Sequence, residues 1–198
     1  MHPPIDSKLP RVGTTIFTVM SRLAAEHGAI NLSQGFPDFD PPERLLDLVN
    51  HHMRKGGAGK QYAPLAGLPS LRQAIATKVA GYYGRTLDPE TEITVTSGGT
   101  EALFCAVQAI VRAGDEVILL DPAYDSYEPA VELAGGRVVR VPLQRPHFGV
   151  DWHRVRDAMT SRTQLLIVNS PHNPTGAVFS AADLDALSDV LRDSPALV

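Results

Sequence analysis

The chain has 198 residues, of which 43% are hydrophobic and 20% are charged, a composition typical of a globular protein with one large domain. A net charge of −4 and a pI near 5.9 argue against nucleic-acid binding. Cys105 is the only cysteine, which excludes an internal disulfide, and no apolar run approaches the length of a signal peptide core or a membrane span. We therefore expect a soluble, cytoplasmic protein without membrane partners.

Apolar periodicity predicts helices and strands that alternate along most of the chain. The expected helices lie at 15–27, 41–55, 69–83, 100–112, in a short run ending near 133, and at 152–159 and 181–191. The expected strands lie at 92–96, 116–120, 137–141 and 165–169. Ser180 and Asp183 have the spacing of a capping box for the last helix. This alternation predicts an α/β fold with a mainly parallel sheet and flanking helices.

The turn Ser97-Gly98-Gly99-Thr100 joins the expected strand at 92–96 to the helix that follows it. A helix leaves its first N–H groups without intrahelical partners, and glycines let a ligand approach the main chain closely. The helix dipole favours an anion there, so the turn is a candidate phosphate site. Its spacing matches neither a P-loop nor a dinucleotide fingerprint. A plain strand-to-helix turn that needs small residues is the alternative at this point.

Two further expected strands end in unusual chemistry, at Tyr124 and at Asn173-Pro174-Thr175-Gly176. Ligands of parallel sheets bind at the carboxyl ends of the strands, so these residues and the glycine turn could share one site. A half-buried loop aromatic and a turn former before proline are the structural alternatives for Tyr124 and Asn173. The seven histidines suggest no metal site, and Cys105 is expected to be a buried structural thiol.

Five segments in family order resemble the pyridoxal-phosphate (PLP) enzymes of aminotransferase fold type I, class I/II, in particular the methionine and kynurenine (glutamine-type) aminotransferases. They cover nearly the whole chain, and together they are highly specific. The segments are Asn31–Phe39 with its Ser-Gln-Gly-Phe-Pro core, Tyr62-x-Pro-x-x-Gly67-x-Pro69-x-Leu71-Arg72, Ser97–Leu103, Asp121–Tyr127 and Asn169–Gly176.

The resemblance implies a role for each candidate cofactor residue. Gly98, Gly99 and Thr100 would cradle the PLP phosphate, and Tyr124 would stack on the pyridine ring, for roughly 1 kcal/mol. Asn173 would donate to the phenolic oxygen of PLP.

The resemblance also implies how substrate and partner subunit are contacted. Asn173 would help to hold the substrate carboxylate, and Gly35 would offer that carboxylate a main-chain N–H. Tyr62 would reach the phosphate of the partner subunit in a homodimer. The implied reaction moves an amino group from an α-amino acid (methionine, aromatic or glutamine-like) to a 2-oxo acid.

The resemblance covers the N-terminal half of the family's length, so we expect an incomplete large domain. Residues 1–45 would be an N-terminal arm and small-domain segment, and residues 46–198 a partial PLP-binding large domain. None of the four lysines has a Schiff-base context, and the family places that lysine beyond Val198. No catalytic residue is therefore assigned, and this chain alone is expected to lack turnover. A cysteine-conjugate β-lyase of the same family and a non-catalytic fragment are the alternatives.

Overall fold

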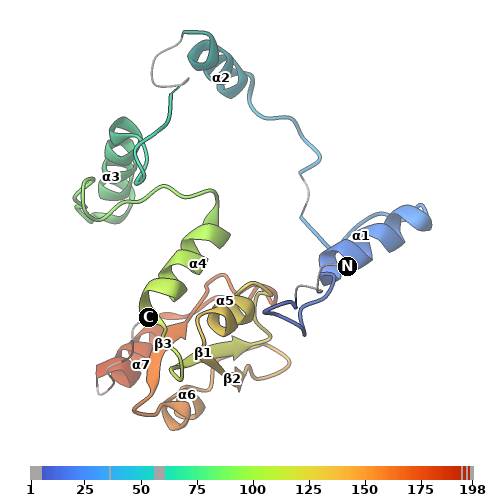
Figure 1. Ribbon diagram of the computed structural model, residues 1–198, viewed down its shortest axis with the longest axis vertical. Coiled ribbons are helices and arrows are strands. Elements are labelled where there is room, and N and C mark those ends of the chain that lie inside the picture. The colour runs from blue at the N-terminus through green and yellow to red at the C-terminus, as the bar shows by residue number, and fades with distance from the viewer. Residues whose placement is uncertain (1–5, 36, 56–60, 193, 195, 197–198) are drawn as a thin grey trace. The chain divides into compact units, whose positions relative to one another are not determined.

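The computed structural model describes residues 6–35, 37–55, 61–192, 194 and 196 (Figure 1). Within them the elements run in the order α1 (Ile16–Glu26), α2 (Glu43–Lys55), α3 (Pro69–Tyr83), α4 (Gly99–Ile110), β1 (Glu116–Asp121), α5 (Tyr127–Leu133), β2 (Arg137–Pro142), α6 (Trp152–Ala158), β3 (Thr163–Ile167) and α7 (Ala181–Arg192). The chain divides into two compact units, which we call the sheet unit (residues 1–15 and 99–198) and the helical unit (residues 16–98).

The sheet unit is built on three parallel strands in the order β2-β1-β3. The central strand β1 has the sequence Glu-Val-Ile-Leu-Leu-Asp, and all of its residues but the last are buried. A strand covered on both faces needs such a continuous apolar run, because successive side chains point to opposite faces. The register pairs Ile118 with Val139 of β2 and with Leu166 of β3.

Each face of the sheet carries its own hydrophobic core. On one face, α4 and α5 pack over Val117 and Leu119 of β1, and on the other, α6 and α7 pack over Ile118 and Leu120 (Figure 1). The buried members of the first core are Val107, Val111, Val117, Leu119, Ala130, Val131 and Leu165. Those of the second are Ile118, Leu120, Val141, Leu143, Val155, Leu166 and Val190. The alternation of β1 therefore builds both cores from one strand.

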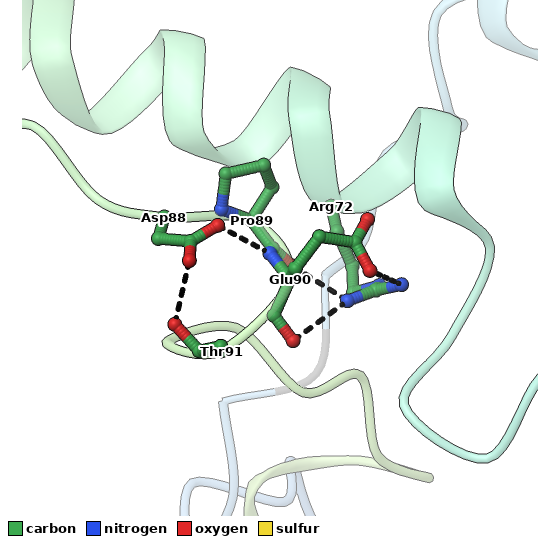
Figure 2. A network of polar contacts seen from close by, with 5 residues as sticks. All are labelled: Arg72, Asp88, Pro89, Glu90 and Thr91. Carbon is green, nitrogen blue, oxygen red and sulfur yellow. Dashed lines mark hydrogen bonds and ion pairs between the residues drawn. The ribbon is translucent and has the colours of Figure 1, made fainter.

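In the helical unit, a buried arginine ties α3 to the turn that follows it (Figure 2). Arg72 is 5% exposed, and its guanidinium donates to the carbonyl oxygen of Pro89 at 2.6 Å and to that of Glu90 at 3.3 Å. It also forms an ion pair with the Glu90 carboxylate at 3.3 Å. Hydrogen bonds from the Glu90 N–H and then from Thr91 Oγ1 lower the pKa of the Asp88 carboxyl. Arg72 therefore fixes the chain just ahead of residues 92–98.

The predicted fold class is confirmed, and nearly all expected elements occur within a few residues of their predicted bounds. The capping box also forms, since Ser180 Oγ and the Asp183 carboxylate each bond the other's backbone N–H. The division at residue 45 between a small-domain segment and a large domain stays a prediction, since the two compact units are defined by contacts within this chain alone.

Two sequence predictions are wrong. Residues 92–96 form no strand, although Val95 N–H donates to the carbonyl oxygen of Ala66 at 3.0 Å. β-branched residues favour a strand only where another strand is available to pair, and a turn residue is the neighbour here. Cys105 is exposed, not buried, because α4 is apolar on several sides and its buried residue, Val107, lies on another side of the helix.

Candidate functional site

The turn before α4 has the backbone form that an anion site requires. Gly98 has a φ of +88°, a conformation that favours glycine, and α4 begins at Gly99. Thr96 Oγ1 donates to the carbonyl oxygen of Gly98 at 2.9 Å, and this bond holds the Gly98 peptide group in place. A Cβ added to Gly98 or Gly99 would meet no atom within 4 Å, so the space beside the main chain is open. The first N–H groups of α4 are therefore approachable by a phosphate.

The segment that leads into this turn is held by a second glycine of the helical unit. Gly67 has a φ of +97°, and a Cβ there would lie 2.7 Å from Cβ of Val95. The close approach lets the Ala66 carbonyl accept the Val95 N–H at 3.0 Å. The segment 62–72 thus has a structural reason for two of its residues. Gly67 allows the close approach to Val95, and Arg72 holds the turn at 89–90.

Tyr124 lies in the loop that follows β1. Its side chain is half-buried, and its ring stands edge-on to that of Tyr127, with centroids 5.6 Å apart and an interplanar angle of 75°. Burial, followed by the proximity of Tyr124, raises the pKa of the Tyr127 hydroxyl. The Tyr127 N–H donates to the Tyr124 carbonyl oxygen at 3.2 Å, so the loop closes on itself where α5 begins.

Arg140 of β2 holds both ends of this Tyr124 loop. Its guanidinium pairs with Asp121, the last residue of β1, and with Glu128 in the first turn of α5. Sequence motifs did not identify this arginine. The sequence offers one signal for it, an arginine two residues before the end of a strand whose parallel neighbour ends in Asp121.

Asn173 lies in the loop that follows β3. Its side chain is exposed, and its backbone N–H donates to Oδ1 of Asn169 at 2.7 Å. The neighbouring His172 is buried, and its Nδ1 lies 2.8 Å from Oγ1 of Thr175. Burial lowers the pKa of the His172 imidazole, and a hydrogen bond with the Leu120 backbone partly offsets that effect. His172 is a second residue that sequence reasoning missed, since its partner in β1 is distant in sequence.

The sheet brings the loops of Tyr124 and Asn173 to one edge. β1 and β3 are parallel neighbours, so their carboxyl ends meet there. Gly99 and Thr100 belong to the same unit, at the start of α4, whereas Gly35, Tyr62 and Gly98 belong to the helical unit. Gly35 and Tyr62 are exposed, Tyr62 fully.

Metal ligands and membrane spans are absent from the part of the chain that the structure describes. No three His, Cys, Asp or Glu side chains gather there as a metal site. Among the same residues, no helix combines the length and the apolar character needed to cross a membrane.

A family model described as "Aminotransferase class I and II" matches residues 27–198. The chain belongs to this family. It is 55% identical over 181 residues to the methionine aminotransferase of Escherichia coli K12, a match that spans 91% of this chain and 46% of the relative. It is 39% identical over 182 residues to human kynurenine–oxoglutarate transaminase 1, across 86% of this chain and 43% of that enzyme.

Solved structures of the family have the same fold. The crystal structure of an E. coli methionine aminotransferase superposes with a TM-score of 0.93 at 52% identity, covering 99% of this chain and 51% of that one. The N-succinyldiaminopimelate aminotransferase of Mycobacterium tuberculosis gives a TM-score of 0.88 at 46% identity, with 94% and 49% covered. The chain thus spans about half the length of the family members it matches. The chain has the α/β fold of the N-terminal part of the fold type I aminotransferases, as the sequence predicted.

Proposed function

We propose that this chain forms the phosphate- and ring-binding part of a PLP-dependent aminotransferase. The observation that carries the proposal is the turn at Gly98, where a left-handed glycine opens the N-terminus of α4. The turn at 98–100 binds the PLP phosphate, whose charge the helix dipole favours, through the N–H groups of Gly99 and Thr100. The Gly98 N–H donates instead to the Thr96 carbonyl oxygen at 2.9 Å and shapes the turn. The turn fits a phosphate because no side chain occupies the space beside its glycines.

The Tyr124 and Asn173 loops hold the ring of the cofactor. The Tyr124 ring stacks on the pyridine face, and its loop is fixed by the two ion pairs of Arg140. The Asn173 amide donates to the phenolic oxygen and helps to orient the substrate carboxylate, to which Gly35 also offers its N–H. When bound, PLP supplies an electron-poor ring that accepts the electrons of the bond broken at the α-carbon. The residues of this chain bind and orient the cofactor and the substrate. The lysine that moves the α-proton is expected in the second half of the family's length.

The proposed substrates are an α-amino acid, methionine, aromatic or glutamine-like, and a 2-oxo acid that receives the amino group. This choice follows two of the relatives, a methionine aminotransferase and a kynurenine–oxoglutarate transaminase. We also propose a cytoplasmic homodimer in which Tyr62 reaches the partner subunit's phosphate. The complete exposure of Tyr62 in this chain is consistent with that role.

The test uses this chain continued by the second half of the E. coli methionine aminotransferase, which supplies the missing lysine. We expect PLP-dependent amino transfer from methionine to a 2-oxo acid. Tyr124→Leu should lower the retained PLP without abolishing turnover, because the phosphate turn still holds the cofactor. A chimera that binds PLP but transfers no amino group contradicts the proposed reaction. A Tyr124→Leu variant that keeps as much PLP as its parent removes Tyr124 from the site.

A further inference from the structure

A cluster of polar side chains joins α1 to the segment that ends at Gly35. Ser21 on α1 is half-buried, and its Oγ accepts an N–H of the Asn31 amide at 3.0 Å and donates to Oε1 of Gln34 at 3.3 Å. Oδ1 of Asn31 accepts the Ser33 N–H at 3.0 Å and the Ser33 hydroxyl at 2.6 Å. One hydroxyl of α1 therefore holds the chain directly ahead of Gly35.

The backbone determines which groups of this cluster donate and which accept. The Ser33 N–H can only donate, so the Asn31 atom beside it is the oxygen Oδ1, and the Asn31 NH₂ group faces Ser21. That NH₂ group also can only donate, so the Ser21 oxygen accepts, and its single proton is available for Gln34. Removal of the Ser21 hydroxyl therefore takes a partner from Asn31 and from Gln34 at once.

The polar cluster, and not apolar burial, holds this segment against α1. In the described part of the chain, backbone hydrogen bonds to α1 end at Ala29, whose N–H donates back into the helix at 2.8 Å. Ile30 and Leu32 are 86% and 88% exposed, whereas Asn31 between them is half-buried. The segment thus turns its polar residue toward the helix, so the loss of that residue's hydroxyl partner should loosen it.

We propose that Ser21 and Asn31 are positioning residues, which hold the main-chain N–H of Gly35 in the direction that a substrate carboxylate requires. The inference rests on the proposed role of Gly35 in binding that carboxylate. Gln34 and Gly35 share the peptide group that carries this N–H, so a Gln34 side chain tied to α1 restricts how the peptide group turns. Gly35 has no side chain, and a Cβ there would meet no atom within 4 Å, so packing at Gly35 itself does not supply this restriction.

The effect on the peptide group is measured by ¹⁵N NMR of this chain. The Gly35 N–H signal is identified as the glycine signal that is lost in Gly35→Ala. Ser21→Ala should shift this signal and that of the Asn31 side-chain amide, and Ser21→Thr, which keeps the hydroxyl, should restore both. Alanine favours a helix more than serine does, so α1 itself should persist. A Gly35 signal that does not move in Ser21→Ala overturns the proposal.

The effect on binding is measured by calorimetry in the PLP-loaded chimera with the second half of the E. coli methionine aminotransferase. The probes are methionine, phenylalanine and glutamine with hydrogen in place of the amino group, and the matching amines with hydrogen in place of the carboxylate. Ser21→Ala should weaken the tightest-binding carboxylate by roughly 3- to 10-fold, as expected for one impaired hydrogen bond, and leave its matching amine unchanged. Ser21→Thr should restore the affinity. Ser188→Ala, the same change at an exposed position of α7, should alter neither probe.

The two classes of probe separate positioning from general damage. A disturbance of the whole site weakens the carboxylate and the amine alike, and that result overturns the positioning role. An unchanged carboxylate affinity in Ser21→Ala overturns this inference alone and leaves the proposed function standing. A parent chimera that retains PLP but binds none of the carboxylates overturns the role of Gly35 in the proposed function, and the inference with it.

Discussion

The two glycines of the turn before α4 should respond in opposite ways to the same added methyl group. Gly98 has a φ of +88°, and an L-residue in that region costs about 1–2 kcal/mol. Gly99 has no positive φ, is the first residue of α4, and has open space where its Cβ would lie. Gly99→Ala should therefore stabilise the fold by about 0.5 kcal/mol, because it restricts the unfolded chain.

The difference between the two alanine variants is then roughly 2 kcal/mol, which is a factor of about 30 in the unfolding equilibrium. Urea unfolding measures it as a shift of the midpoint at constant slope. Gly98→Asn should recover part of the loss, since Asn adopts left-handed backbone more readily than Ala does. Equal stability of Gly98→Ala and Gly99→Ala would refute the role of the positive φ.

The same pair tests the phosphate site. Gly98→Ala moves the N–H groups of the turn, so PLP affinity should fall in an absorbance titration. Gly99→Ala leaves the backbone in place, so its affinity should stay close to that of the parent. Gly81→Ala within α3, where an added Cβ also meets no atom, is the matched control for helix stabilisation. If Gly98→Ala binds PLP as the parent does, the phosphate lies elsewhere.

Three further predictions concern other polar contacts. Arg72→Met should lower the free energy of unfolding by about 2–3 kcal/mol, because it removes a buried cation with three acceptors, and a loss below about 0.5 kcal/mol in urea would contradict this. Arg140→Met should lower the free energy of unfolding by only about 1 kcal/mol, since its ion pairs are half-exposed. It should nevertheless weaken PLP binding, whereas the control Arg137→Met on the same strand should leave PLP binding unchanged. Hydrogen bonds from Ser180 and then from the Trp152 indole lower the pKa of the Asp183 carboxyl, so its stabilisation is complete above about pH 4 and is lost as the pH falls through the lowered folded value. The cost of Asp183→Asn, roughly 1 kcal/mol at pH 7 by urea unfolding, should therefore vanish in acid, and a pH-independent cost would argue against the ionised carboxylate as its cause.

The sequence predicted the elements well where local signals are strong. The apolar run of β1, the proline at the start of α3 and the capping box of α7 each determine structure within a few residues. The failure at 92–96 has a physical cause, since strand formation depends on a neighbour that periodicity does not reveal. The buried environments of His172 and Arg72 were hidden for the same reason, because their partners lie 17 to more than 50 residues away in the chain. The roles of Tyr124 and Asn173 stay predictions.

The two edges of the sheet differ in what they offer to another strand. The outer strand β2 carries Arg137, Arg140 and Pro142, and proline and charge discourage further pairing. The other outer strand, β3, has the sequence Thr-Gln-Leu-Leu-Ile, without charge or proline, and in the described part of the chain only β1 pairs with it. Strand β2 thus resists pairing with a further strand, whereas β3 can pair with one. A strand supplied by further chain, or by a neighbouring molecule at high concentration, should therefore add beside β3.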